Sequence, residues 1–204
     1  MALIFTKINN ERNKLIERDT YNDSKTASRL NVITVDVLPR FTVSYFDGSK
    51  RHSCKMSWDD LENTIDFLDN MLKFERTPLI QSKYDNFLCQ LKSSKIDVAD
   101  HILKNEIVID NINSIGIEGK YVLSKNRYPY DFGDHHHYLL WIHPDCDNDT
   151  KLNIFDKSKC HKIIFDLVHN YSSISTINKK FMIFRNNPKN KSVQAIEHFH
   201  VIFY

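Results

Sequence analysis

The sequence predicts an α+β protein with an antiparallel sheet and helices mainly on one side. Short runs of apolar and β-branched residues, typical of strands, recur along its 204 residues. Between them lie segments whose apolar residues are three or four positions apart, which is typical of amphipathic helices. One pair of strand-like runs is joined by Asp47-Gly48, a favoured two-residue hairpin turn. A hairpin pairs its strands in antiparallel order, which sets the expected type of sheet.

The first half of the chain predicts a hairpin followed by helices. Ser57 and Asp60 have the spacing of a capping box, so a helix is expected to begin there. Its apolar stripe continues for several turns, and Pro78 is expected to stop it. The predicted elements are strands over 32–37, 41–46 and 51–56, the helix that starts at Trp58, and helices over 84–91 and 98–104.

The second half is richer in strands. A boundary near residue 105 would separate a hairpin-and-helix region of unknown role, residues 1–105, from a second domain, residues 106–204. Two layers of one continuous domain would give the same pattern. The predicted elements are strands over 106–110, 120–124, 138–142, 181–184 and 197–203, and a helix over 157–170 that Asp156 or Ser158 caps.

Composition indicates an ordinary globular protein without a polyanionic partner. The 28 basic residues nearly balance the 26 acidic ones, so nucleic acid is not indicated. No segment reads as an export signal or is long and apolar enough to cross a bilayer, so a cytoplasmic location without a membrane partner is expected. The abundance of Asn, Ile, Lys and Asp is typical of an AT-rich genome, such as that of a virus or an intracellular microbe. In a viral protein, the compartment would be the host cytoplasm.

Histidines on two apolar strands indicate a site. His198 and His200 lie in the last strand-like run, and strand side chains alternate between faces. Both imidazoles should therefore point to one face, about 7 Å apart. A second cluster, 135–137, opens the apolar run 138–142. Polar rings on strands that otherwise read as buried suggest a functional site rather than a scaffold.

Residues 121–144, YVLSKNRYPYDFGDHHHYLLWIHP, resemble the first half of the histidine-triad (HIT) superfamily of nucleotide hydrolases and transferases. The shared pattern is a strand, an Asn-Arg-x-Pro-like turn, then a histidine and an apolar strand that ends in Pro. A helix, a strand, a polar loop and alternating histidines on the last strand follow in that superfamily. The resemblance covers the C-terminal half, 106–204. The resemblance does not explain residues 1–105, whose hairpin and helices would serve as a lid or a homodimer surface.

The same segments also resemble a fungal family of uncharacterised proteins described as N-acetylglucosamine-induced. This second resemblance brings no established activity, but it indicates that the segments belong to one site. The elements that carry it are Pro129-Tyr130-Asp131, His137-Tyr138-Leu139-Leu140-Trp141, Asn187-Pro188, Ser192-Val193 and His198-Phe199-His200-Val201.

The chain departs from a full triad, His-x-His-x-His, because it has only two alternating histidines. In the preferred register, Ile196 replaces the first histidine and His198 takes the place of the nucleophile. In the other register, His200 is the nucleophile. The first register is preferred because the sequence spacing between Ser192 and the histidines is then nearer to that of the superfamily, although it is one residue too long. Lys191 stands where the superfamily has Gln.

The HIT resemblance implies attack by an imidazole on the α-phosphorus of a nucleotide ester or anhydride. The nucleotidyl-histidine that forms would then be cleaved by water. A histidine pKa near 6.5 leaves the attacking nitrogen unprotonated at neutral pH, and no cofactor is expected. The predicted roles are catalysis by His198 and His200, charge stabilisation by Lys191 and Ser192, ribose contact by Asn126, and phosphate contact or orientation of the nucleophile by His137.

Two other functions fit the same residues. One is a metal site, because several imidazoles could hold Zn²⁺ or Fe²⁺ with an open position. Its candidate ligands are His135, His137, His198 and His200. The other is a binding or interaction protein that has lost its chemistry, which the missing third histidine supports.

Overall fold

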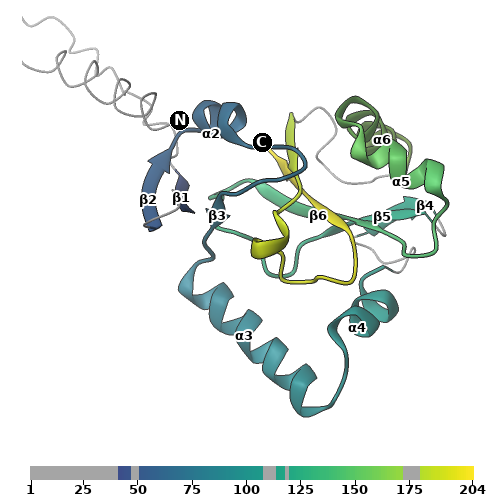
Figure 1. Cartoon of the computed structure of the whole chain (residues 1–204), viewed down its shortest axis with the longest axis horizontal. Coiled ribbons are helices and arrows are strands. Elements are labelled where there is room, and N and C mark those ends of the chain that lie inside the picture. Colours follow the sequence, from purple (N-terminus) through teal and green to yellow (C-terminus); the bar gives the residue numbers. More distant parts are fainter. Residues whose placement is uncertain (1–40, 47–50, 108–113, 118–119, 172–179) are drawn as a thin grey trace, which may run out of the picture. The chain divides into compact units, whose positions relative to one another are not determined.

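Five antiparallel strands form the central sheet of the protein (Figure 1). The computed structural model describes residues 41–46, 51–107, 114–117, 120–171 and 180–204. Within them, the strand order is β4-β5-β6-β8-β7, and every neighbouring pair is antiparallel. The α+β class with antiparallel pairing is thus confirmed. The strands are β4 (Ser114–Ile117), β5 (Tyr121–Lys125), β6 (His136–Ile142), β7 (Phe181–Phe184) and β8 (His198–Phe203).

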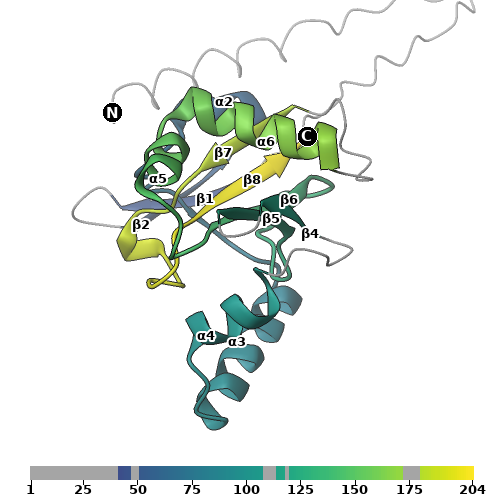
Figure 2. The same ribbon diagram turned by 90° about the vertical axis from the view of Figure 1, so that its right-hand side faces the viewer.

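One face of this sheet packs against two helices. These are α5 (Asn148–Phe155) and α6 (Lys157–Tyr171), which lie over β7 and β8 in Figure 2. Phe199, Val201 and Phe203 of β8 point to this face and join Ile164 of α6 in the main core. Their burial fixes the register of β8, because a slip by one residue would move these side chains to the other face.

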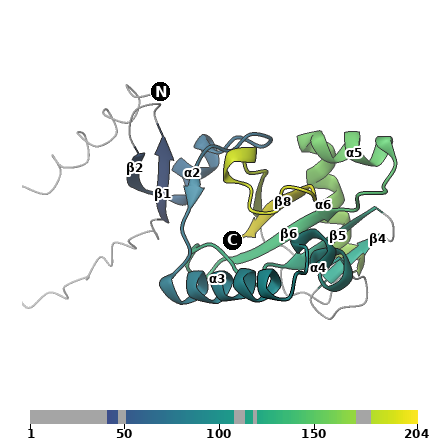
Figure 3. The ribbon, with the colours of Figure 1, turned by 60° about the horizontal axis from the view of Figure 1, so that its bottom comes forward.

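The opposite face carries the histidines. His198 is the register partner of Trp141, and His200 is the partner of Leu139 on β6 and of Phe184 on β7. Two helices, α3 (Pro78–Ser93) and α4 (Val98–Asn105), lie on this side, away from α5 (Figure 3). Ile102 of α4 packs against Trp141.

A small three-stranded sheet contains the predicted hairpin. Its order is β2-β1-β3, with β1 (Phe41–Phe46) antiparallel to β2 (Arg51–Met56) and to β3 (Lys73–Phe74). The Asp47-Gly48 turn and the predicted strand 32–37 lie outside the described residues. Phe74 contacts Phe184 of β7, with 5.1 Å between ring centroids, and this contact joins the small sheet to the central one.

The helix after the hairpin is shorter than predicted. The capping box of Ser57 and Asp60 is present and begins α2 (Trp58–Thr64). The helix then ends well before Pro78, because Asp66 Oδ1 accepts hydrogen bonds from the backbone N–H groups of Leu68 and Asp69. Such a side chain offers the backbone an alternative to helical hydrogen bonds. The apolar stripe therefore continues in sequence but not in helical form.

Pro78 begins a helix instead of ending one. Thr77 caps α3 by accepting a hydrogen bond from the N–H of Ile80, and Pro78 occupies the first helical turn. Proline is favoured there because its missing N–H has no partner in the helix. The helix predicted over 84–91 is thus part of a 16-residue helix.

The remaining elements largely agree with the sequence-based expectations. Helix α4, the four strands from 120 onwards and α6 are present, and Asp156 caps α6 by accepting from the N–H of Lys159. Strand β4 and helix α5 were not predicted. Of the predicted strand 106–110, Glu106 and Ile107 are not in a strand, and the rest lies outside the described residues.

Residues 37–204 form one compact unit, which includes residue 105. Among the described helices, none has the length and apolar character needed to cross a membrane.

Candidate functional site

Three buried histidines lie together on the face of the sheet that carries α3 and α4. His137 is 3% exposed, and His198 and His200 are each 4% exposed. They converge because β6 and β8 are neighbours and alternation directs all three rings to the same face. His137 Nε2 is 2.9 Å from His200 Nδ1, and the rings of His198 and His200 are 5.5 Å apart between centroids.

The direction of the His137–His200 hydrogen bond follows from the backbone. The N–H of Tyr130 donates to His137 Nδ1 over 3.1 Å, so this nitrogen carries no proton. In a neutral imidazole, the proton is then on the other nitrogen. His137 Nε2–H therefore donates to His200 Nδ1, and His200 holds its own proton on Nε2.

Asn186 supplies the acceptor for the last proton of this chain. Its amide group lies 3.0 Å from His200 Nε2 and 3.0 Å from Tyr130 Oη, measured from Asn186 Nδ2. The two ends of an amide are assigned by their partners. A backbone N–H cannot reverse, whereas an amide can rotate by 180°. A proton on His200 Nε2 requires the Asn186 oxygen at this place, where it accepts from both the imidazole and the phenol. The amide is then rotated by 180° from the orientation in which Nδ2 donates to Tyr130 Oη and Oδ1 accepts from Asn70 Nδ2 over 3.4 Å. Asn70 Nδ2 keeps its hydrogen bond to Leu72 O over 3.0 Å.

His198 lies beside this chain but is bonded differently. Its Nδ1 is 3.0 Å from the carbonyl oxygen of Ile196, which can only accept, so Nδ1 carries the proton. Nε2 is then the unprotonated nitrogen. Among the described residues, no hydrogen-bond partner faces His198 Nε2. The ring packs on Trp141, with 4.8 Å between centroids. A histidine with one unprotonated nitrogen at a pocket is suited to act as a nucleophile.

Burial keeps all three imidazoles neutral at physiological pH. Desolvation is the main cause in each case, because a charged ring loses its hydration in the interior. It lowers the pKa of His198 to about 4 and that of His137 to about 3, and it lowers the pKa of His200 well below its usual value. The charge of Arg76 lowers the pKa of His137 and of His200 further.

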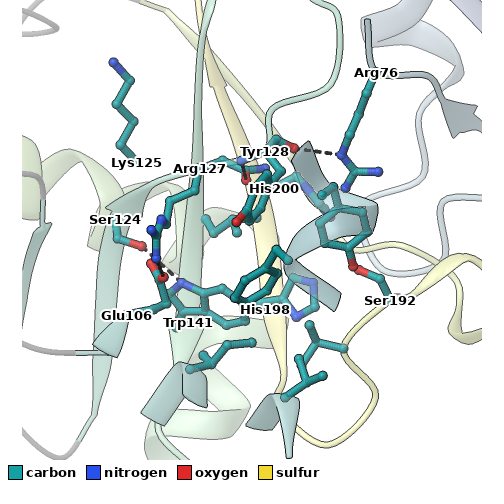
Figure 4. Close-up of a pocket in the computed structure, with 17 residues that line it drawn as sticks. Arg76, Glu106, Ser124, Lys125, Arg127, Tyr128, Trp141, Ser192, His198 and His200 are labelled. Atoms are coloured by element: carbon teal, nitrogen blue, oxygen red, sulfur yellow. Dashed lines mark hydrogen bonds and ion pairs between the residues drawn. The ribbon is translucent and has the colours of Figure 1, made fainter. Parts of the chain in front are cut away.

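A pocket opens beside His198 and His200 (Figure 4). Its volume of about 70 Å³ is enough for a few water molecules or one phosphate-sized group. A larger ligand would have to extend through the opening. The wall contains Ser124 of β5, Trp141 of β6 and Ser192 of the loop before β8. Trp141 Nε1–H donates to Ser124 Oγ over 3.1 Å, which fixes the indole ring in the wall.

Arg76 brings a positive charge to the pocket. Its Nε–H donates to the carbonyl oxygen of Tyr128 over 2.9 Å, and its guanidinium lies over the rings of Tyr84 and Tyr130, at 4.4 and 4.9 Å from their centroids. Lys125 also lines the pocket, but its side chain points away from the other labelled groups in Figure 4. The charge of Arg76 lowers the pKa of His137 and of His200, whereas the charge that lowers the pKa of His198 is that of Lys191.

Aromatic side chains from α3 form another part of the wall. Tyr84 and Phe87 line the pocket together with Tyr128. Phe87 stacks on Tyr128, with 5.3 Å between centroids and an angle of 28° between ring planes. Arg127 also lines the pocket, but its charge is paired with Glu106 over 2.7 Å. Flat aromatic groups of this kind can stack with a planar base.

The structure brings only some of the predicted site residues to the pocket. His198, His200, Asn126 and Ser192 line it, whereas His137 and Lys191 do not. His137 is bonded to His200, and the Asn126 amide nitrogen lies 3.4 and 3.3 Å from its two ring nitrogens.

Lys191 is turned to an acidic partner. Its Nζ is 2.7 Å from Glu197 Oε1, and its side chain is only 5% exposed. The lysine charge is therefore neutralised by an ion pair, and its predicted role at a phosphate receives no geometric support.

Of the residues proposed as alternative metal ligands, His137, His198 and His200 lie together but His135 does not join them. His135 lies against Trp58, with 4.9 Å between ring centroids, in an aromatic cluster that also contains Tyr204. His137 and His200 direct nitrogens at each other instead of at a common point. Within the described ranges, no group of three or more side chains is placed to hold a metal ion.

Sequence reasoning missed the contribution of residues 76–87. Arg76, Tyr84 and Phe87 precede the HIT-like segment, and no motif connects them with it. One signal was available: Tyr84 and Phe87 are three apart in a predicted helix, which places both on one face. Such a stripe is usually part of a core, so the sequence alone could not assign it to a pocket.

Comparison with known proteins identifies a family but no activity. The family described as proteins of unknown function, DUF3605, matches residues 57–204. No curated protein matches the chain. A solved structure described as "Crystal Structure of HTC1" is 18% identical with a TM-score of 0.39, and the match covers 64% of this chain and 76% of that one. Because the family model matches residues 57–204, well over half of the sequence, this chain belongs to the DUF3605 family, and the match contains every residue of the pocket.

Proposed function

We propose that the protein is a nucleotide phosphohydrolase or nucleotidyl transferase that acts at an α-phosphate through a covalent intermediate on His198. The observation that carries the proposal is the hydrogen bond from His198 Nδ1 to the carbonyl oxygen of Ile196, 3.0 Å long. It fixes the tautomer in which Nε2 has a lone pair available for attack. A relationship of the site to the HIT superfamily is part of the same proposal.

The electrostatics favour this role for His198. Its pKa of about 4 keeps the ring unprotonated at neutral pH, so no separate base has to activate it. Arg76 faces the same pocket and would neutralise the non-bridging oxygens of a phosphate. His200 is a weaker candidate for the nucleophile, because both its nitrogens are engaged with His137 and Asn186.

The wall of the pocket also suits a nucleoside. A planar base could stack on one of the half-buried rings of Tyr84, Phe87 and Tyr128, and each stacked base is worth about 1–3 kcal/mol. The volume beside His198 matches a phosphate group rather than a whole nucleotide. The base and ribose would therefore lie toward the opening, along α3, while the phosphorus lies near the imidazole.

The reaction would proceed in two balanced steps. The Nε2 lone pair of His198 forms a P–N bond, and the leaving group departs with the electron pair of its P–O bond. A water oxygen then attacks phosphorus, the P–N electrons return to Nε2, and the water proton passes to solvent. In a transferase, an acceptor hydroxyl or phosphate takes the place of water.

Turnover of defined nucleotides tests this proposal. Purified protein is incubated with dinucleoside polyphosphates, nucleoside diphosphates and nucleoside phosphoramidates, and nucleoside monophosphate is measured. We expect activity in the wild type and a loss of at least 10³-fold in His198→Ala, the scale seen when a covalent nucleophile is removed.

The matched control is His169→Ala, which removes an exposed histidine of α6, outside the pocket. It should retain wild-type activity. Absence of turnover with every substrate class, or equal activity of His198→Ala and wild type, would refute the proposal.

A further inference from the structure

A second pocket adjoins the first. It has a volume of about 200 Å³, and Arg76 and Ser192 line both pockets. Lys73 of β3, Gln81 of α3 and Asn190 also line the second pocket. The two cavities thus meet at a guanidinium and a hydroxyl, and a ligand bound at this junction could occupy both of them.

Arg76 is held at the junction with its terminal nitrogens available. Its Nε–H is used by the carbonyl oxygen of Tyr128, and the rings of Tyr84 and Tyr130 support the plane of the guanidinium. Within the described part of the chain, no carboxylate forms an ion pair with Arg76. A guanidinium fixed in this way is pre-organised to bind an anion with both terminal amino groups.

The second pocket is cationic. Lys73 and Arg76 contribute positive charge, and no aspartate or glutamate is among its described lining residues. Gln81 and Asn190 each use one amide N–H within the protein, toward Asp85 Oδ1 over 2.8 Å and Met71 O over 3.2 Å, and each has a second N–H to donate. Ser192 adds a hydroxyl. This set favours phosphate oxygens and disfavours a protonated amine, because a like charge near two cations is repelled.

We propose that the second pocket is the subsite for the leaving group and selects an anionic, phosphorylated one. This inference rests on the proposed function. Attack and departure at phosphorus are in line. With the phosphorus in the first pocket between His198 and Arg76, in-line departure would direct the leaving group past Arg76 into the second pocket, toward Lys73. A phosphate also departs as a stable anion, whereas an amine must first be protonated.

Binding of small anions tests the subsite without assuming a base or a reaction. Inorganic phosphate and pyrophosphate are titrated into the His198→Ala protein by calorimetry, because that variant cannot form the intermediate. We expect pyrophosphate to bind at least tenfold more tightly than phosphate. The additional variant Lys73→Gln should reduce this ratio to near one. Lys157→Gln, which removes an exposed lysine of α6 outside both pockets, should not change it.

Kinetics provide the second measurement. The ratio of kcat/KM for ADP to that for adenosine 5′-phosphoramidate should be at least ten in the wild type and should fall about tenfold in Lys73→Gln. Equal affinities for phosphate and pyrophosphate, or Lys73→Gln indistinguishable from Lys157→Gln, would overturn the subsite. Selective pyrophosphate binding without any turnover would instead overturn the proposed function and would leave the second pocket as an anion-binding site without a role in a reaction.

Discussion

His198 and His200 are close on β8, yet their ring nitrogens have different surroundings. His200 is enclosed in a chain of hydrogen bonds that begins at the backbone of Tyr130 and ends at Asn186. His198 has one nitrogen bonded to a carbonyl oxygen and the other unprotonated at the pocket. The pair therefore divides into a candidate nucleophile and a ring that positions its neighbours.

Asn186 completes the buried chain, so its removal should be costly. In Asn186→Ala, the N–H of His200 and the hydroxyl of Tyr130 lose their shared acceptor. An unpaired buried donor costs about 1–3 kcal/mol, so the free energy of unfolding should fall by roughly 2–5 kcal/mol. Urea denaturation measures this change. Asn63→Ala, at an exposed position of α2, should shift stability by less than about 0.5 kcal/mol. Equal effects of the two variants would contradict the network.

The buried histidines should make stability depend on pH. Their folded pKa values lie below the unfolded value near 6.5: about 3 for His137, about 4 for His198, and well below 6.5 for His200. The unfolded chain thus binds more protons between these values, and stability rises with pH in that range. It is fully present above about pH 7 and is lost as the pH falls toward 4.

Each of these histidines should contribute a slope on the order of 1 kcal/mol per pH unit within that window. The check is the urea midpoint at pH 7.5, 6.0 and 5.0, which should fall steadily. In His198→Gln the slope should be smaller, because one titrating ring is gone. A midpoint that does not change from pH 7.5 to 5.0 would show that the rings are already solvated in the folded protein.

At the scale of elements, the capping box of α2 provides a local prediction. The N–H of Asp60 donates to Ser57 Oγ over 3.2 Å, and the N–H of Ser57 donates to Asp60 Oδ2 over 3.3 Å. Ser57→Ala removes the side-chain acceptor and should lower the free energy of unfolding by about 1 kcal/mol. Ser93→Ala, at the end of α3, should change it by less than about 0.5 kcal/mol in thermal or urea unfolding. If Ser57→Ala leaves the free energy of unfolding unchanged, water replaces the cap without loss of stability.

The sequence was informative where the local pattern and the tertiary structure agree. The strands β5 to β8 carry enough apolar residues to be recognised, and the capping box of Ser57 has a fixed spacing. The end of α2 was not predictable, because it depends on Asp66 bonding to the backbone instead of the helix continuing. Pro78 was interpreted as a stop, although proline is equally suited to the first turn of a helix.

The site was predictable only where one strand carries several of its residues. Side chains alternate between the two faces of a strand, so His198 and His200 could be placed on one face without any knowledge of the fold. Asn126 and Ser192 were found through family resemblance. Arg76 could not be found, because its place at the pocket depends on how β3 and α3 pack against the central sheet. The ion pair of Lys191 with Glu197 also needed the folded loop, since six positions separate the two in sequence.

At the scale of the whole molecule, the two halves of the sequence share backbone hydrogen bonds. Asn70 N–H donates to Arg185 O over 3.0 Å, and Arg185 N–H donates to Phe67 O over 2.8 Å. Phe67 also stacks on Phe199 in the main core, with 5.2 Å between centroids. These contacts connect β7 and β8 to residues that precede the predicted boundary at 105.

A fragment of residues 106–204 should therefore not fold independently. It would expose the apolar surfaces that Phe67 and Phe74 cover and would leave the backbone of Arg185 unpaired. We expect poor dispersion of its amide proton NMR signals and rapid proteolysis, in contrast to the whole chain. A well-dispersed spectrum and a cooperative unfolding transition for the fragment would show that the second half is an independent domain.

The bond between His198 Nε2 and phosphorus is detectable by intact-protein mass spectrometry after brief incubation with a nucleoside diphosphate or dinucleoside polyphosphate. We expect a mass increase of one nucleotidyl group on the wild type and on His169→Ala, and none on His198→Ala. An adduct that persists on His198→Ala, or turnover by the wild type without any adduct under rapid quenching, would contradict a covalent intermediate on His198.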